Sequence, residues 1–461
     1  MKHWNIEEKS EIKRVVALID GEHYPQVTLD AITILKELYP GKVKGIIFMG
    51  GTEKLVVSDL ESYFGEKVFT VRSLEQDFIK ALDYFNPDLI FDLSDEPVVN
   101  YCTRMKIASL CFAKKCSYMG PDFWFKYEDR DFVSSLPTIG IIGTGKRIGK
   151  TAISAFVSKF FSREEKKKVC VVAMGRGGPA VPEVLKGDSQ EITPQYLLEL
   201  SNRGFHASSD YIEDALMSKI PTIGCRRCGG GFGGKTFTSN VREGILEAEM
   251  LNPDLIIVEG SGASLPDVVT DVNICVTGAY QDWESLVGYL GIYRLMLADL
   301  VVLTMCEEPL ASEEDIDFLT RKIREVNPGA PIIKSIFRPQ PLSDITSKKV
   351  FITMTAKEGI CSKIKNYVEK KFNCNVVGIS FNLSNREKLR KDLEEISGYD
   401  LVLTELKAAS VDIVTDFAIK SGKQIVYMNN IPIILGGDET LFKEKLKLIY
   451  EKAVSFKARN V

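Results

Sequence analysis

The sequence predicts an α/β chain in which parallel β-strands alternate with helices. The first observation is a recurring pattern: a short apolar run rich in β-branched residues, then Gly or a polar residue, then a segment of helix length. Runs that are apolar at nearly every position suit strands buried on both faces, as in a parallel sheet. The second observation is the alternation itself, which is the order of βαβ units.

The strand pattern occurs ten times in three groups, and each group implies its own α/β domain. A first group lies at 14–22, 44–51 and 88–96, a second at 138–145, 168–178, 254–262 and 299–305, and a third at 350–356, 375–381 and 400–405. Segments 118–137 and 337–349 separate the groups. The 461 residues therefore predict three domains, at 1–130, 131–345 and 346–461, the last ending in a Lys- and Glu-rich surface helix near 438–458.

Composition and charge exclude several classes of protein. The chain has 59 Lys and Arg against 63 Asp and Glu, a net charge of -4, whereas a general nucleic-acid binder is usually basic. No apolar run reaches the ~18 residues of a membrane span, and the opening MKHWNIEEKSEIKR lacks the apolar core of a signal peptide. Ten scattered cysteines then indicate reduced thiols. We expect a cytoplasmic protein that binds neither nucleic acid nor membrane.

Two glycine-rich stretches have the spacing of a phosphate-binding loop. Residues 229–236 fit the pattern G-x-x-x-x-G-K-[ST] literally, and residues 143–151 fit it less literally. A phosphate loop must leave a buried strand and open directly into a helix, so that backbone N–H groups face the phosphates. Only the 143–151 loop has that context, because it follows TIGII and precedes the helical pattern KTAISAFVSKFF. The sequence therefore predicts a P-loop NTPase domain with its nucleotide site at 143–151.

The chemistry assigns a part to each residue of this loop. Glycines let the backbone approach the anion, Lys150 reaches the β- and γ-phosphates, and the Thr151 hydroxyl is placed for Mg²⁺. Lys146 and Arg147 add cations over the γ-phosphate or an anionic acceptor, so we predict catalytic roles for Lys146, Arg147 and Lys150. The alternative is a glycine turn before a helix. The predicted nucleotide-binding residues are Gly143, Thr144, Gly145, Lys146, Ile148, Gly149, Lys150, Thr151 and Ala152.

A P-loop enzyme also needs an acidic residue at a neighbouring strand end to hold the metal. The run LIIVEGSG supplies Glu259, whose alternative role is to cap the next turn. Asp210, in HASSDYIEDAL, is either a second metal contact or a helix cap. No [NT]KxD guanine-reading motif occurs, which favours ATP over GTP.

The other glycine-rich stretch predicts a second anion site beside the nucleotide. Arginine binds phosphate or carboxylate in a bidentate way, and glycines let a ligand meet the backbone. The alternative is a mobile surface loop. Cys225 and Cys228, which flank its arginines, form a single CxxC; they are either small flanking residues or, less favoured, a metal or redox pair. The predicted substrate-binding residues are Arg176, Arg226, Arg227, Gly230, Gly231 and Lys235, together with His23 and Lys407 at strand ends of the outer domains.

Two resemblances extend this interpretation. GTGKRIGKT followed by DLIIVEGSG, with SSDYIEDAL, resembles the dethiobiotin synthetase branch of P-loop enzymes, which use ATP to make an acyl-phosphate anhydride. That resemblance covers the middle domain and implies that Asp210 contacts a metal. LIDGEHYP, GTGKRIGKTA, CRRCGGGFGGKT and LTELKAASVD together resemble the archaeal cyclic 2,3-diphosphoglycerate synthetase family over nearly the whole chain.

The second resemblance implies a specific reaction. Members of that family close the two phosphates of 2,3-diphosphoglycerate into an intramolecular anhydride, with Mg²⁺ and ATP, and release ADP and phosphate. The resemblance also implies a cytoplasmic homodimer whose activity potassium assists. Two other hypotheses stay open from the residues: a different ATP-dependent small-molecule kinase or ligase, and a nucleotide-dependent switch or scaffold. The cation-rich glycine loop argues against the switch, which has no need of a second polyanion site.

Overall fold

The computed structural model describes residues 11–437 and 439–460, so most of the opening segment in which we found no export signal lies outside the described residues. Two compact units form. One contains the chain up to Asp129 together with 282–297 and 325–327, and the other contains 130–281, 298–324 and 328–461. Within the described ranges, no helix is long and apolar enough to cross a membrane.

The N-terminal unit is a six-stranded sheet in the order β3-β2-β1-β4-β5-β6, parallel except for β6. Its strands are β1 (Val15–Ile19), β2 (Val43–Phe48), β3 (Val68–Thr70), β4 (Leu89–Asp92), β5 (Ser117–Met119) and β6 (Trp124–Phe125). Its helices are α2 (Pro25–Leu38), α3 (Leu60–Phe64), a π-helical turn at Leu74–Phe78, α4 (Ile79–Phe85), α5 (Tyr101–Ala113), α10 (Trp283–Gly288) and α11 (Gly291–Met296). The three strands predicted here are confirmed.

The helices α10 and α11 come from the middle of the chain and pack against α5 of the N-terminal unit. Phe112 of α5 and Tyr293 of α11 meet edge to face, with ring centroids 5.6 Å apart. Sequence periodicity did not predict that residues 282–297 belong to the N-terminal unit, because their packing partner α5 is far away in the chain.

The larger unit contains one sheet of 13 strands, in the order β11-β10-β8-β12-β7-β13-β14-β15-β19-β18-β16-β17, with β9 paired to β10. The strands around the predicted phosphate loop are β7 (Thr138–Gly143), β8 (Val169–Gly175), β9 (Glu183–Lys186), β10 (Pro221–Cys228), β11 (Thr238–Ser239), β12 (Leu255–Glu259), β13 (Val272–Gly278) and β14 (Leu300–Thr304). The others are β15 (Ile332–Pro341), β16 (Lys349–Thr353), β17 (Asn375–Ser380), β18 (Leu401–Glu405) and β19 (Gln424–Ile434).

Helices cover both faces of this sheet around β7 and β12. The core on one face joins α6, α8 and α16 to the strands, and the core on the other joins α9. The helices are α6 (Lys150–Lys159), α7 (Pro194–Asn202), α8 (Asp210–Ser218), α9 (Val241–Met250), α12 (Glu313–Val326), α13 (Cys361–Phe372), α14 (Arg386–Glu395), α15 (Asp416–Lys420) and α16 (Glu439–Asn460). Short turns are π-helical at Phe160–Glu164 and Ser410–Thr415 and 3-10 at Glu358–Ile360 and Leu435–Gly437. The predicted α/β class with a parallel P-loop sheet is confirmed.

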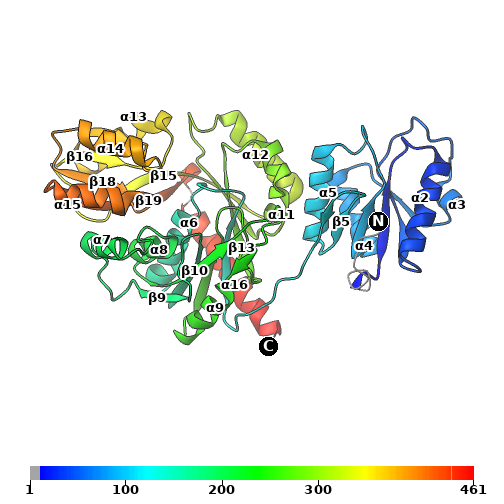
Figure 1. Cartoon of the computed structure of the whole chain (residues 1–461), viewed down its shortest axis with the longest axis horizontal. Coiled ribbons are helices and arrows are strands. Elements are labelled where there is room, and N and C mark those ends of the chain that lie inside the picture. The colour runs from blue at the N-terminus through cyan, green and yellow to red at the C-terminus, as the bar shows by residue number, and fades with distance from the viewer. Residues whose placement is uncertain (1–10, 438, 461) are drawn as a thin grey trace. The chain divides into compact units, whose positions relative to one another are not determined.

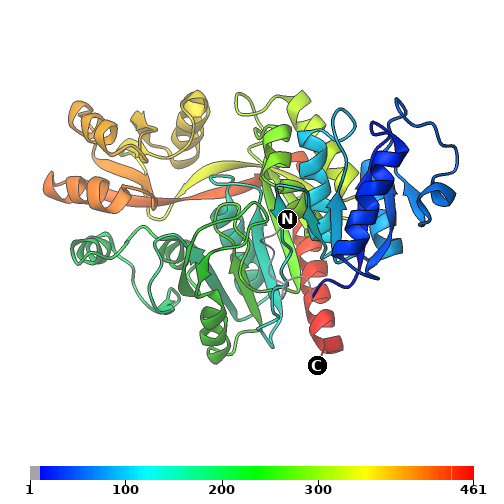
Figure 2. The same cartoon turned by 45° about the vertical axis from the view of Figure 1, so that its right-hand side comes forward.

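Strand β15 joins the P-loop sheet to the C-terminal strands (Figures 1 and 2). Its residues 332–334 pair in parallel with β14, and its residues 335–341 pair antiparallel with β19. The separating segment that we took to begin at 337 therefore starts inside a strand. The P-loop and C-terminal regions form one compact unit because a single ladder of backbone hydrogen bonds passes through both.

Candidate active site

The 143–151 loop has the geometry that a phosphate site needs. Strand β7 ends at Gly143, and α6 begins at Lys150, with Gly149 as its N-cap in the left-handed region at φ 90°. A Cβ on Gly149 would lie 2.2 Å from Phe337 Cζ, so only glycine fits there. By contrast, β10 is followed by a turn and the short β11 before α9 begins at Val241. The predicted strand–loop–helix context of residues 143–151 is confirmed.

Lys150 is buried at the base of this loop. Its Nζ donates to the carbonyl oxygen of Gly145 at 2.8 Å and to that of Gly262 at 2.7 Å. Burial lowers the pKa of Lys150 to about 8, against the opposing effect of the Glu259 and Asp210 carboxylates. A phosphate group next to Lys150 would stabilise its protonated form, because the anion offsets the cost of burying the positive charge.

Lys150 opens onto a cavity of about 590 Å³ within the larger unit. Part of its wall is apolar and includes Leu310, Phe337 and Ile360. Predicted charged residues also line the cavity. The predicted residues that line the cavity are Lys146, Arg147, Gly149, Lys150, Thr151, Ala152, Arg176, Asp210, Glu259 and Lys407. The cavity thus combines cations, carboxylates and an apolar wall.

The remaining predicted loop residues do not line the cavity but hold the loop in place. Ile148 is buried, and Thr144 Oγ1 donates to Gln281 Oε1 at 2.6 Å and lies 2.9 Å from Thr277 Oγ1. Gly143 would place a Cβ 2.7 Å from Ile148, and Gly145 supplies the carbonyl that accepts from Lys150. These residues position the loop that surrounds any phosphate.

The metal candidates face the same cavity. Glu259 ends β12 and is buried, and its Oε1 has no hydrogen-bond partner among the described residues. Burial raises the pKa of Glu259 to about 7. Asp210 is the first residue of α8, whose N-cap is Ser209, so it does not have the N-cap position that we weighed for it.

These residues fit Mg²⁺ that is shared with a nucleotide. In residues 11–437 and 439–460, no group of three or more His, Cys, Asp or Glu side chains could hold a metal by itself. Magnesium usually takes one or two carboxylates and completes its shell with water and substrate phosphates. An unpartnered buried oxygen of Glu259, which lines the same cavity as Thr151 and Asp210, suits that mode of binding.

An ion pair between the partly buried Lys407 and the buried Glu213 brings the C-terminal strands to the site, and sequence reasoning missed the glutamate. Lys407 Nζ lies 3.1 Å from Glu213 Oε1 of α8. Burial disfavours the lysine charge, but Glu213 and Glu405 outweigh it and raise the pKa of Lys407. Burial in turn raises the pKa of Glu213 to about 7. The signal for Glu213 was present in SSDYIEDAL, where three acids fall within five residues beside an apolar face.

The second predicted anion site is only partly assembled around the cavity. Arg176 lines it, and the buried Arg227 reaches toward it, with Nη2 donating to Ser261 O at 2.9 Å. Besides Arg227, four other predicted residues do not line it: Arg226, Gly230, Gly231 and Lys235, all exposed. Cys225 is buried, Cys228 is exposed, and both are free thiols.

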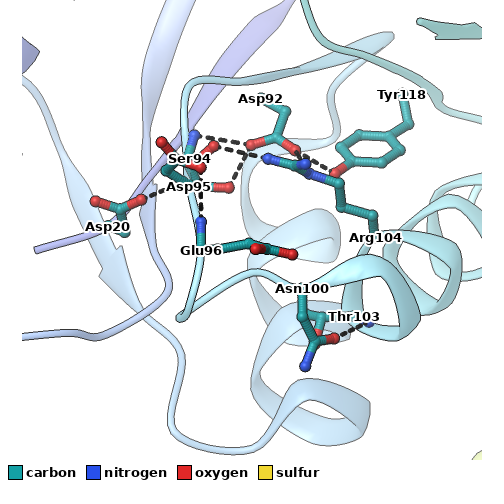
Figure 3. Close-up of polar contacts among 9 residues, drawn as sticks. All are labelled: Asp20, Asp92, Ser94, Asp95, Glu96, Asn100, Thr103, Arg104 and Tyr118. Atoms are coloured by element: carbon teal, nitrogen blue, oxygen red, sulfur yellow. Dashed lines mark hydrogen bonds and ion pairs between the residues drawn. The ribbon is translucent and has the colours of Figure 1, made fainter. Parts of the chain in front are cut away.

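His23 belongs to the N-terminal unit, where its Nδ1 lies 3.0 Å from Asp20 Oδ1. Asp20 follows β1, and Figure 3 shows that it forms part of a polar network with the end of β4. There Asp92 accepts from Ser94 N at 2.8 Å and from Arg104 Nε at 3.1 Å. This network satisfies its own donors and acceptors, so the part of His23 in substrate binding stays a prediction.

Comparison with known proteins extends over nearly the whole chain. Models of the cyclic 2,3-diphosphoglycerate synthetase N-terminal, P-loop and C-terminal domains match residues 14–126, 138–336 and 341–431. The cyclic 2,3-diphosphoglycerate synthetase of Methanosphaera stadtmanae is 44% identical over 97% of this chain and 98% of its own. That of Methanothermus fervidus is 46% identical over 92% and 94%, and that of Rubrobacter xylanophilus 42% identical over 93% and 96%. This chain belongs to the cyclic 2,3-diphosphoglycerate synthetase family.

Proposed function

We propose that the protein forms cyclic 2,3-diphosphoglycerate from 2,3-diphosphoglycerate, using ATP and releasing ADP and phosphate. One observation carries the proposal: the cavity gathers Lys146, Arg147, Lys150 and Arg176 beside a phosphate loop. Among the described residues, none of these four side chains forms an ion pair with a carboxylate. Lys146, Arg147 and Arg176 are exposed, and Arg147 and Arg176 repel the charge on Lys146, so a polyanionic ligand would relieve that repulsion.

The two ligands match the two chemistries of the cavity wall. The triphosphate of ATP would bind the 143–151 loop and Lys150, and the base would lie on the apolar wall at Leu310 and Phe337. The substrate, with about five negative charges near pH 7, would bind Lys146, Arg147, Arg176 and Arg227. Lys407 would contact one of its phosphates from the C-terminal side.

Two displacement steps account for the reaction. An oxygen of one substrate phosphate attacks the γ-phosphorus of ATP, the β–γ anhydride bond breaks, and ADP leaves. An oxygen of the other substrate phosphate then attacks the phosphorus of the first substrate phosphate, the anhydride bond formed in the first step breaks, the ring closes, and the transferred phosphoryl group leaves as inorganic phosphate. The attacking oxygens are already ionised, so no strong general base is needed. Lys150, Lys146 and Arg147 hold the reacting groups in line and neutralise charge as it develops.

Thr151, Glu259 and Asp210 would hold Mg²⁺ against the nucleotide phosphates, where it supplies Lewis-acid charge neutralisation. We also propose, on the family resemblance alone, that the enzyme works in the cytoplasm as a homodimer and that K⁺ assists it.

A panel of acceptors tests the proposal against another ATP-dependent kinase or ligase. The expected result is that 2,3-diphosphoglycerate stimulates ADP release, while 3-phosphoglycerate and amino- or carboxylate acceptors do not. Lys150→Ala should lower that rate by about 10²–10³-fold, and Lys391→Ala, on the exposed surface of α14, should leave it unchanged. Stimulation by a different acceptor, with none by 2,3-diphosphoglycerate, would support the alternative ligase.

A further inference from the structure

Three cationic side chains, from the start of α6, the end of β8 and the end of β10, converge on the peptide of Gly262. Lys150 Nζ donates to Gly262 O at 2.7 Å. A Cβ on Gly262 would lie 3.1 Å from Arg176 Nη2 and 3.6 Å from Arg227 Nη2. Arg227 Nη2 also donates to the carbonyl of Ser261 at 2.9 Å. Gly262 itself stands in the left-handed region at φ 64°.

Gly262 belongs to a turn that follows β12, from Ser261 to Ser264. The turn is closed by two backbone hydrogen bonds, Ser261 N to Ser264 O at 3.2 Å and Ser264 N to Ser261 O at 3.0 Å. The next residue, Leu265, donates to Gly234 O of the glycine loop at 2.9 Å. One short turn therefore contacts the nucleotide lysine on one side and the arginine and glycine loop on the other.

A phosphate group is a stronger partner for a cation than a peptide carbonyl is. A nucleotide at Lys150 would therefore draw Nζ away from Gly262 O, and a substrate at Arg227 would draw Nη2 away from Ser261 O. Each ligand would therefore remove a side-chain hydrogen bond from a carbonyl oxygen of the same turn. The ligand that binds first has to loosen the turn, and the second ligand finds it already loosened.

We propose that the Ser261–Ser264 turn couples the ATP and 2,3-diphosphoglycerate sites, with Gly262 as its positioning residue. This inference rests on the proposed function. Repulsion between the two arginines supports it, since burial and Arg176 together lower the pKa of Arg227. The coupling would favour the state in which both polyanions are bound, so that ATP is spent only when its acceptor is present.

The test measures the dissociation constant of Mg²⁺ with a non-hydrolysable ATP analogue, by calorimetry, with and without saturating 2,3-diphosphoglycerate. The full chain should bind the analogue at least fivefold more tightly with 2,3-diphosphoglycerate, within the usual range of coupling. Gly262→Ala adds a Cβ against Arg176 and strains the turn, so the ratio should fall to about one. Gly398→Ala is the matched control, with φ 78° and no atom within 4 Å of its Cβ, and should keep the wild-type ratio.

Each outcome decides the inference separately from the proposed function. If the wild-type chain binds no 2,3-diphosphoglycerate, the proposed function fails. If it binds both ligands with a ratio of one, or if Gly262→Ala keeps the wild-type ratio, the inference alone is overturned. Should Gly262→Ala not fold, Gly262→Asn replaces it, because asparagine tolerates the left-handed region and still adds bulk. Steady-state rates give a second readout: loss of coupling raises ADP release without the acceptor.

Discussion

At the scale of single residues, the cost of burying charge shifts the pKa values of the buried lysine and glutamates at the site. Burial lowers the pKa of Lys150 to about 8 and raises those of Glu213 and Glu259 to about 7. Residue types and positions at the phosphate loop could be predicted from the sequence, because a phosphate loop is a local motif. The pairing of Glu213 with Lys407 could not, since the two lie on elements almost two hundred positions apart and meet only through the fold.

Lys150 gives the stability of the chain a distinct pH dependence. It releases its proton near pH 8 in the folded chain and near 10.5 in the unfolded chain. Between these values the unfolded chain binds more protons, so the free energy of unfolding rises with pH, by on the order of 3 kcal/mol. Lys150→Met should lack this gain. Urea unfolding of both proteins from pH 7.5 to 10.5 measures the difference, and parallel curves would show that Lys150 is not buried as a cation.

The Glu213–Lys407 pair should matter for stability as well as for activity. Lys407→Ala leaves Glu213 buried beside no cation, which should cost about 1–3 kcal/mol. The double variant Lys407→Ala with Glu213→Gln should recover most of that stability without recovering ADP release. Thermal unfolding and the acceptor-dependent rate measure the two effects. If the double variant recovered both the stability and the acceptor-dependent rate in full, Lys407 would have no part in substrate binding.

At the scale of elements, the phosphate loop is fixed by the strand that packs on it. Strands with continuous apolar runs, such as β7, β8 and β12, could be predicted from the sequence. Strand β15 could not, because its two prolines resemble a linker and its pairing partners β14 and β19 are non-local. Phe337 on β15 therefore lines the site, although no local sequence motif predicts it.

Gly149 should be intolerant of any side chain. Gly149→Ala places a methyl group 2.2 Å from Phe337 Cζ at φ 90°, so it should cost roughly 1–3 kcal/mol and weaken ATP binding. Adding Phe337→Ala removes the clash and should restore part of the affinity. Gly65→Ala, at φ 65° with open space around its Cβ, controls for backbone strain alone. Equal ATP affinities for the wild type and Gly149→Ala would contradict the packing that we describe.

At the scale of the whole molecule, the net charge is negative although cations are in local excess around the cavity. The net charge is -4, yet Lys146, Arg147, Lys150 and Arg176 share one cavity. The fold class and the phosphate loop both followed from the sequence. The attachment of α10 and α11 to the N-terminal unit did not, because periodicity identifies an element but not its partner.

Ionic strength should separate substrate binding from chemistry. If the cation cluster holds the substrate as proposed, raising choline chloride from about 0.05 to 0.5 M should increase the KM for 2,3-diphosphoglycerate several-fold and change kcat less. Choline is chosen so that potassium does not vary. A KM independent of salt would mean that apolar or hydrogen-bonding contacts, and not the cation cluster, hold the substrate.

The most direct measurement follows 31P NMR spectra of the purified protein with Mg²⁺, ATP and 2,3-diphosphoglycerate. The account predicts new anhydride resonances from a cyclised product, which appear together with ADP and inorganic phosphate and are absent with Lys150→Ala. Turnover of ATP with unchanged 2,3-diphosphoglycerate resonances would contradict it.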